Sequence, residues 1–457
     1  MIKHHIKSIA VKRLFGRYSY RIPGDGAALS DLNILYGENG LGKTTLLTLV
    51  FQMLMIDKFP GYADSISKMA FESFEITLND GSKISASKDK QLLIGETLFS
   101  ISNESEVYVK WQYVPGSHGN LASSALPENI DVSKLPKSMR DRVISILNQK
   151  EYFNKLGALE SSAYLLTSDR MLLGDFKVSD RDNRLGPERS RLKISELVAT
   201  YRNEAIVDSL KETSRWLQDQ FLDSSYRLTG TRNIYEDVIT RIASSTYKTR
   251  SGLGSSLVNS IKKELLNNIS ELNKNSAEYL KIGIGDTGVS ESLAETVDAC
   301  VGNRLSLVNE VLGPYLQDLR NRQNRIDKPF NIVKRFILSA NRFFKDKRLT
   351  FDIVSGLKIF VTVNDELTSD EISPDQLSSG EKQLIFILCR VLSAAKESSI
   401  FIIDEPEISL NVLWQRMLVS TLQELSEGGR LQFILASHSM EIIAQHNDRV
   451  VVLNEIF

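Results

Sequence analysis

The sequence predicts an α/β protein with a mixed sheet, flanking helices, a small β-rich part and a mainly helical insertion. Short apolar runs at 32–36, 400–403 and 431–436 each lead into glycines, carboxylates or a serine-histidine pair. Such runs are typical of buried parallel strands whose carboxyl ends carry a site. Alternating runs between 71 and 114 predict a β-rich part, and helical spacing between about 194 and 325 predicts the insertion.

The composition is that of an ordinary folded protein. Of the 457 residues, 42% are hydrophobic and 25% are charged, which excludes a mainly disordered or low-complexity chain. The 56 basic residues nearly cancel the 57 acidic ones, so any nucleic-acid surface has to be a local patch. Two cysteines, Cys300 and Cys389, are too few for a disulfide framework or a four-cysteine zinc site. A reducing compartment fits best.

No part of the sequence predicts a membrane segment. No apolar run approaches the roughly 18–20 residues that cross a bilayer. The first 20 residues are basic, but they contain no apolar segment of a signal peptide. We therefore expect a soluble cytoplasmic protein without a membrane partner.

The strand at 32–36 is followed by a phosphate-binding loop. GENGLGKTT has the spacing G-x-x-x-x-G-K-T, and the apolar stretch after it predicts a helix. Glycines let backbone N–H groups point at a phosphate, and the helix N-terminus adds partial positive charge. Lysine should reach the β- and γ-phosphates, and the first threonine should bind Mg²⁺. The predicted ATP-binding residues are Gly37, Glu38, Asn39, Gly40, Gly42, Lys43, Thr44 and Thr45.

The strand at 400–403 ends in paired carboxylates, Asp404 and Glu405. Asp404 is predicted to hold the magnesium ion with Thr44, and Glu405 to orient or deprotonate the attacking water. A strand that ends in Asp-Glu is weak evidence alone, because many edge turns share that pattern. The order of the neighbouring motifs strengthens it.

Two further segments lie on either side of this strand. LSSGEKQ at 377–383 precedes an apolar helix. Its serine hydroxyls and backbone N–H groups can form a second anion site. The alternative is that a serine is an ordinary N-cap of the helix. The strand at 431–436 is followed by His438, which contacts the γ-phosphate or the catalytic water unless it is only structural. The predicted residues of the first segment are Ser378, Ser379, Gly380 and Glu381.

Together these segments resemble the head of ABC-type ATPases. They match, in order, the Walker A loop, the signature, Walker B with its catalytic glutamate, and the switch histidine, while 408–415 matches the D-loop. More than 300 residues separate Walker A from the signature, whereas transporter subunits place the two much closer. The pattern is therefore similar to the SMC, RecF and OLD-related branch. Ser379 and Asn411 depart from the residues that are usual in the family.

The resemblance implies a mechanism. Two heads pair head to tail, and the signature of one chain contacts the γ-phosphate of the ATP held by the other. The expected cofactors are ATP and Mg²⁺, and the expected assembly is a dimer or a higher even oligomer. ATP hydrolysis is expected to be slow and regulatory, so that it acts as a timer.

Aromatic residues between 13 and 22 have two interpretations. Phe15 and Tyr18 stand where this family often packs an aromatic side chain on adenine. Alternating side chains of an edge strand explain the same pattern.

The middle of the chain is expected to be β-rich first and helical later. NDG at 79–81 predicts a hairpin, 135–157 predicts a helix, and 163–171 predicts a strand that ends near Asp169. Asp169 is a candidate magnesium or water sensor, or only a capped strand terminus. Helices are expected over 194–222, 255–280 and 291 to about 325, the last ending near Pro329. Sustained heptads and a CxxC motif are missing, so we expect a compact arm without a zinc hook.

A basic segment lies between Arg320 and Arg348. It contains ten Lys or Arg residues and two acidic ones, with phenylalanines between them. Such a segment can follow a phosphate backbone, or it is the solvated face of a helix whose phenylalanines pack inward. The candidate contacts to a nucleic acid or a partner are Arg320, Arg322, Lys334, Arg335 and Arg342.

The expected domains are an N-terminal lobe at 1–175, a helical arm at 190–330 and a C-terminal lobe at 331–457. The sequence runs 19 residues beyond His438, which leaves no room for a Toprim nuclease of the OLD type. We therefore expect the effector in a separate chain. The chain resembles PtuA-type ATPases of Septu and retron antiphage systems, whose partner is an HNH nuclease. The alternatives are a RecF-like repair ATPase that binds DNA or RNA, and a switch with negligible hydrolysis.

Overall fold

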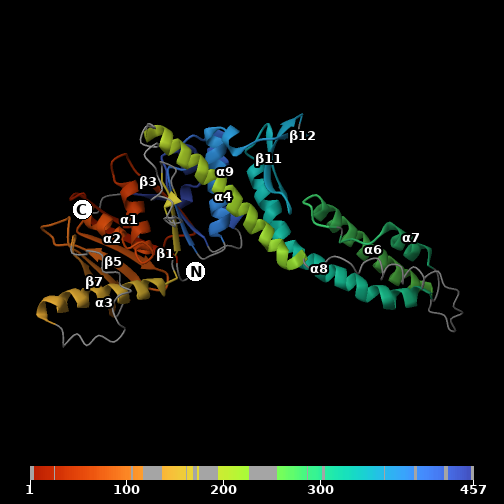
Figure 1. Cartoon of the computed structure of the whole chain (residues 1–457), viewed down its shortest axis with the longest axis horizontal. Helices are drawn as coiled ribbons and strands as arrows, with labels where there is room; N and C mark the ends of the chain where they lie inside the picture. The colour runs from red at the N-terminus through yellow and green to blue at the C-terminus, as the bar shows by residue number, and fades with distance from the viewer. Residues whose placement is uncertain are drawn as a thin grey trace. The chain divides into compact units, whose positions relative to one another are not determined.

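The computed structural model describes residues 5–24, 26–103, 106–116, 136–160, 162–167, 172–173, 194–225, 255–285, 287–300, 304–364, 366–395, 399–426 and 431–453. The chain forms two compact units (Figure 1). The first unit consists of Met1–Arg202 and Arg390–Phe457, and the second consists of Asn203–Cys389. The three-part division expected from the sequence stays a prediction.

A mostly parallel sheet forms the centre of the first unit. Four of its neighbouring strand pairs are parallel, and the pair β8–β9 is antiparallel. Three central strands, β3, β14 and β13, are almost entirely buried, which explains why they are continuous apolar runs. The strand order is β15 (Val450–Val452), β3 (Leu32–Tyr36), β14 (Gln432–Ala436), β13 (Ser399–Asp404), β8 (Ser162–Leu166) and β9 (Leu172–Leu173).

An antiparallel sheet forms the rest of the first unit's core. Its inward residues alternate along each strand with half-buried or exposed ones, as one-sided packing requires. The predicted hairpin at 79–81 is confirmed, because β4 and β5 pair around it. The strand order is β2 (Tyr18–Ile22), β1 (Ile6–Leu14), β4 (Ser73–Leu78), β5 (Lys83–Ser87), β6 (Thr97–Ser102) and β7 (Val107–Tyr113).

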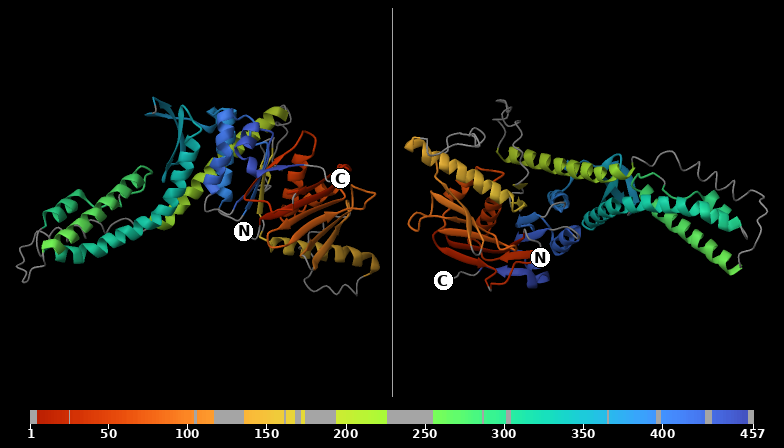
Figure 2. Two further views of the ribbon diagram at one scale, coloured as in Figure 1. Left: turned by 180° about the vertical axis from the view of Figure 1, so that it is seen from behind. Right: turned by 90° about the horizontal axis from the view of Figure 1, so that it is seen from below.

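Helices cover both sheets of the first unit. The helix predicted over 135–157 is confirmed as α3, whose buried Tyr152 contacts Trp111 on β7. Figure 2 shows α3 along one face of the antiparallel sheet. The helix α1 is buried along most of its length and contacts β8, β13 and β14. The helices are α1 (Lys43–Met55), α2 (Tyr62–Lys68), α3 (Lys137–Gly157), α10 (Val412–Ser426) and α11 (Met440–Gln445).

The second unit contains the helical arm and a small antiparallel sheet. Figures 1 and 2 both show α6 (Ser255–Leu280) beside α8 (Arg304–Asn341), and α7 (Glu291–Ala299) packs on α6. Their buried leucines, isoleucines and valines form a core of their own. The sheet consists of β10 (Lys347–Asp352), β11 (Gly356–Val363) and β12 (Glu366–Glu371). The remaining helices with described bounds are α4 (Ile194–Ser225) and α9 (Ser379–Ala394).

The end predicted for the arm's last helix is wrong. The helix does not stop near Pro329: α8 contains both Pro314 and Pro329 and continues to Asn341. Proline removes one helical hydrogen bond, at a cost of about 3 kcal/mol. Buried apolar side chains continue on one face beyond it, Phe330, Val333 and Phe336 among them, and this packing offsets the cost. A sequence rule for helix ends does not include that burial.

Two other predictions concern the strand at 163–171 and the residue Asp169 near its end. The strand predicted over 163–171 is shorter, since β8 ends at Leu166. Asp169 lies outside the described residues. Among the helices that the structure describes, none is long and apolar enough to cross a membrane.

Candidate nucleotide-binding site

The Walker A loop has a backbone that only glycine adopts easily. Gly40 and Gly42 have φ angles of 89° and 83°, in the left-handed region. A Cβ atom on Gly42 would lie 2.9 Å from the Phe15 ring and 3.0 Å from Leu14. The loop therefore needs glycine at position 42 both for its backbone angle and for space. The helix α1 begins directly after it, at Lys43.

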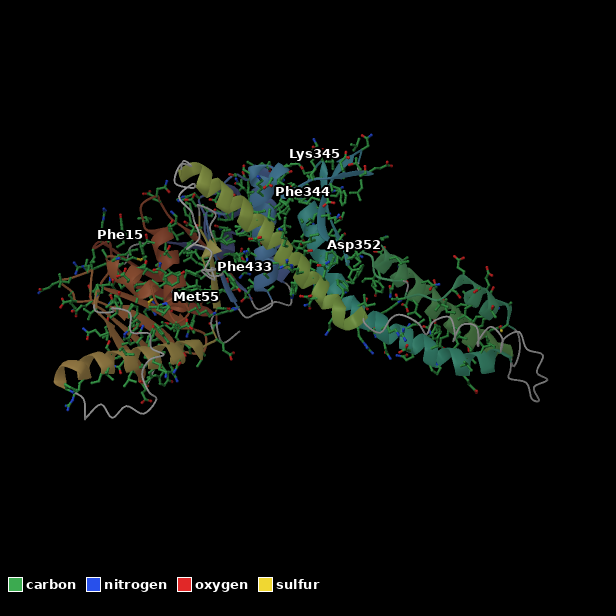
Figure 3. All side chains as sticks on the ribbon, in the orientation of Figure 1. Phe15, Met55, Phe344, Lys345, Asp352 and Phe433 are labelled. Carbon is green, nitrogen blue, oxygen red and sulfur yellow. The ribbon has the colours of Figure 1, made fainter. Side chains whose placement is uncertain are left out.

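The turn between β1 and β2 lies against this loop. Phe15 is 50% exposed, and it is labelled in Figure 3. Tyr18 stacks on Tyr20 with 6.0 Å between ring centroids, and the Tyr20 hydroxyl donates to the Leu41 carbonyl at 3.0 Å. An exposed ring beside the loop fits base stacking, so the adenine role of Phe15 stays a prediction. Tyr20 was not among the predicted site residues, because a buried tyrosine in a strand has no distinctive sequence signal.

The contact between Tyr20 and Leu41 leads to a measurable expectation. Tyr20→Phe removes one hydrogen bond that holds the loop, which is worth about 0.5–1.5 kcal/mol. We expect the dissociation constant for ATP, measured by calorimetric titration, to rise about 3- to 10-fold. Tyr62→Phe is the matched control, because Tyr62 lies in the same unit and packs on Phe51 and Phe59. An unchanged affinity in Tyr20→Phe would show that the contact does not shape the loop.

Lys43 is folded into the loop. Its ammonium group donates to the carbonyls of Gly37 at 2.7 Å and Glu38 at 3.0 Å, and the residue is 6% exposed. Burial lowers the pKa of Lys43, while the carboxylates of Glu405 and Asp404 act in the opposite direction. Two backbone carbonyls therefore partner the ammonium group, and its contact with a phosphate stays a prediction.

The first helix and the Walker B strand meet at one hydrogen bond. The Thr44 hydroxyl donates to Asp404 Oδ2 at 2.7 Å, although the two residues are 360 positions apart. Burial raises the pKa of Asp404, the Thr44 bond lowers it, and the nearby Glu405 raises it further. A hydroxyl and a buried carboxylate are hard oxygen ligands of the kind that Mg²⁺ prefers. These two residues can therefore hold that ion.

Glu405 has a strained backbone. Its φ angle is 51°, in the left-handed region that costs a non-glycine residue about 1 kcal/mol. Its N–H donates to the Ala436 carbonyl at 2.8 Å, which ties the end of β13 to β14. Strain of this kind is common at functional sites. The predicted catalytic residue thus lies half-buried at the carboxyl edge of the sheet.

Glu407, which was not among the predicted site residues, holds the backbone of the segment that contains His438. Glu407 Oε1 accepts the backbone N–H groups of His438 at 2.7 Å and Ser439 at 3.1 Å. The Ser439 hydroxyl in turn donates to Gln415 at 2.7 Å. Glu407 comes two residues after Glu405, and this position next to the Walker B carboxylates is the only sequence signal that could have identified it. It fixes the main chain that carries His438.

The signature segment begins α9 as a capping box. Ser378 Oγ accepts the Glu381 N–H at 3.3 Å, and the Ser378 N–H donates to Glu381 Oε2 at 2.7 Å. The N-cap interpretation is therefore confirmed for Ser378. Ser378 and Ser379 are exposed, while Gly380 is buried. An exposed serine at a helix N-terminus can still bind an anion.

The structure confirms inward packing for the phenylalanines of the basic segment. Phe330, Phe336, Phe343 and Phe344 are at most 8% exposed, so they cannot stack on bases. Three of the candidate cations form ion pairs: Arg320 with Glu271, Arg322 with Asp318, and Lys334 with Glu278. Nucleic-acid contact through this segment stays a prediction, and any such contact has to compete with these pairs.

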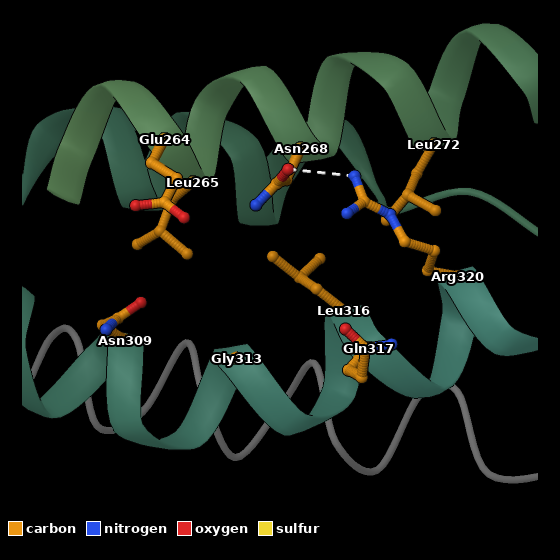
Figure 4. A pocket seen from close by; sticks show the side chains of 9 residues that line it. All are labelled: Glu264, Leu265, Asn268, Leu272, Asn309, Gly313, Leu316, Gln317 and Arg320. Carbon is orange, nitrogen blue, oxygen red and sulfur yellow. Dashed lines mark hydrogen bonds between the residues drawn. The ribbon is translucent and has the colours of Figure 1, made fainter. Parts of the chain in front are cut away.

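A groove of about 130 Å³ lies between α6 and α8, away from the nucleotide-binding residues in sequence. Figure 4 shows the leucines and polar side chains that line it, with Asn268 accepting a bond from Arg320. Arg320 also pairs with Glu271, so its charge is already satisfied.

Comparison with known proteins points to the same chemistry. Residues 301–444 match the family model described as "AAA domain, putative AbiEii toxin, Type IV TA system". The manganese transport system ATP-binding protein MntB of Halalkalibacterium halodurans is 30% identical over 143 residues, 29% of this chain and 53% of that protein. A putative ABC transporter ATP-binding protein of Clostridium acetobutylicum is 25% identical over 171 residues, covering 33% and 60%. The chain spans little more than half the length of these relatives.

Solved SMC heads are also similar. The Smc head domain of Pyrococcus furiosus, bound to the C-terminal domain of ScpA, has 14% sequence identity and a TM-score of 0.32, and the match covers 96% of this chain and 91% of that one. The family and relative matches confirm the predicted resemblance to ABC-type ATPases.

Proposed function

We propose that this chain, which is similar to the ATP-binding subunits of ABC-type ATPases, binds and slowly hydrolyses ATP between two paired copies, and that this pairing controls a separate effector. The carrying observation is the 2.7 Å hydrogen bond between Thr44 and Asp404. This bond brings the start of α1 next to the end of β13, and it supports a phosphate site between these two elements.

Each residue has a distinct part in the proposed mechanism. Lys43 exchanges its two carbonyl partners for phosphate oxygens, and the N–H groups of the loop surround the same phosphates. Glu405 accepts a proton from the attacking water, and His438 contacts the γ-phosphate. Thr44 and Asp404 would hold Mg²⁺, which when bound would neutralise developing phosphate charge.

The second copy contributes the signature. Ser378 and Ser379 are exposed in the single chain and are therefore available to a partner's γ-phosphate. A ligand that contacts both copies favours the paired state by its differential affinity. ATP thus joins the two heads, and its hydrolysis releases them.

The effector is proposed to be a nuclease of the HNH kind in an antiphage system. The matched family's description mentions a toxin of a toxin-antitoxin system, which agrees with a defence role.

The decisive experiment uses the Glu405→Gln variant of the full chain, purified from its native host. Its mass is measured with and without ATP, and co-purifying proteins are identified. We expect an ATP-dependent doubling of the mass and a nuclease in the complex. A mass that ATP does not change would refute the pairing, and a clean ATP-dependent dimer that captures DNA would favour a repair ATPase.

The repair-type alternative makes its own prediction about the basic segment. If the arm contacts DNA through Lys334 and Arg335, changing both to Glu should abolish ATP-dependent DNA binding and reduce its salt dependence. Our own expectation differs from that of the repair-type alternative. Because Lys334 already pairs with Glu278 at 3.4 Å, we expect the affinity for DNA to change less than twofold. Fluorescence anisotropy with labelled duplex at several salt concentrations distinguishes the two results.

A further inference from the structure

A chain of hydrogen bonds joins Lys347 to the signature serine. The Lys347 ammonium donates to Glu381 Oε1 at 2.9 Å. The other carboxylate oxygen of Glu381 accepts the Ser378 N–H at 2.7 Å, and the Glu381 N–H donates back to Ser378 Oγ at 3.3 Å. Glu381 thus uses one oxygen for Ser378 and the other for Lys347.

The pair is well shielded from water. The side chains of Lys347 and Glu381 are 25% and 11% exposed. Burial acts to raise the pKa of Glu381, but the hydrogen bonds from Lys347 and Ser378 outweigh it, so the pKa lies below its ordinary value. A partly buried carboxylate that loses its cation becomes costly, and it either takes up a proton or turns toward solvent. Turning toward solvent would break the bond that the Ser378 N–H donates, and taking up a proton would weaken it.

Lys347 itself is held by the fold. It is the first residue of β10 and pairs with Val361 on β11. Two residues later, Leu349 exchanges two hydrogen bonds with the Asn341 side chain at the end of α8, at 2.7 Å and 2.9 Å. The ammonium group is therefore presented to Glu381 from a fixed backbone.

We propose that Lys347 is a positioning residue, which orients Ser378 through Glu381 for contact with the γ-phosphate of the ATP held by a second copy. This inference rests on the proposed pairing, since Ser378 acts there in trans. It gives Lys347 a role different from the nucleic-acid contact that its place in the basic segment suggested.

The test compares matched lysines in the Glu405→Gln background. Lys347→Met removes the cation, Lys347→Arg restores it, and Lys358→Met is the control because Lys358 pairs with Glu371 at 2.7 Å in the same small sheet. Labelled ATP measures nucleotide affinity at low protein concentration, and sedimentation velocity measures ATP-dependent pairing. We expect Lys347→Met to keep its ATP affinity within about twofold and to pair about tenfold more weakly. Lys347→Arg and Lys358→Met should pair like the parent.

The outcomes separate a failure of the role proposed for Lys347 from a failure of the proposed pairing. Equal pairing by Lys347→Met and the parent overturns the role of Lys347 and leaves the proposed function standing. A parent that does not pair with ATP overturns the proposed function, and the role of Lys347 falls with it. Equal weakening by Lys358→Met shows a general loss of stability and also overturns the inference. If circular dichroism shows that Lys347→Met is unfolded, Lys347→Gln replaces it in the same comparison.

Discussion

Replacing Glu405 with glutamine is expected to lower ATP turnover about 100- to 10,000-fold, the range typical of losing a general base. Glutamine has nearly the same shape, and the hydrogen bond that holds this residue comes from its backbone N–H to Ala436. The φ angle of 51° therefore needs no change. ATP affinity should stay within a few-fold of the parent, because Lys43, Thr44 and Asp404 are untouched.

The measurement is phosphate release at saturating ATP together with nucleotide binding. The control is Glu441→Gln, which removes a carboxylate from the nearby helix α11, where Glu441 pairs with Arg416 at 2.6 Å. That variant should turn over ATP like the parent. Turnover that survives in Glu405→Gln would contradict the catalytic role, and negligible turnover in the parent would favour a switch that only binds ATP.

Much of the first unit's core follows from local sequence patterns. Continuous apolar runs identify β3, β13 and β14, because strands buried on both faces have no polar side to alternate with. The NDG turn identifies the β4–β5 hairpin. The extent of α8 could not be predicted the same way. Its passage through Pro329 depends on tertiary burial of Phe330 and Val333, which local spacing does not reveal.

Some residues of the candidate site could also be predicted from local patterns, and others could not. The residues proposed to contact phosphate or metal stand in fixed motifs, so Lys43, Thr44 and Asp404 were recognisable. The structure joins the last two by a hydrogen bond. Residues that hold those motifs in place act from other elements. Tyr20 reaches the Walker A loop from β2, and Lys347 reaches the signature from β10. Since each uses a single side-chain contact across the fold, no local pattern marks it.

Removing the Lys43 ammonium is expected to produce the largest loss of ATP binding without a loss of stability. Lys43→Met keeps most of the apolar stem but no charge, and losing charge-assisted bonds to phosphate should weaken ATP affinity about 100-fold or more.

The stability expectation follows from the sign of the pKa shift. Burial lowers the pKa of Lys43, which means that the folded state disfavours its charge relative to the unfolded chain. Neutral methionine removes that penalty, but it also removes the hydrogen bonds to the Gly37 and Glu38 carbonyls. These effects oppose each other, so the free energy of unfolding should stay within about 1 kcal/mol of the parent. Calorimetric titration and thermal melting measure the two quantities, with Lys68→Met on the exposed surface of α2 as the control. A large loss of stability would mean that Lys43 supports the empty loop, and ordinary ATP affinity would refute the Walker A assignment.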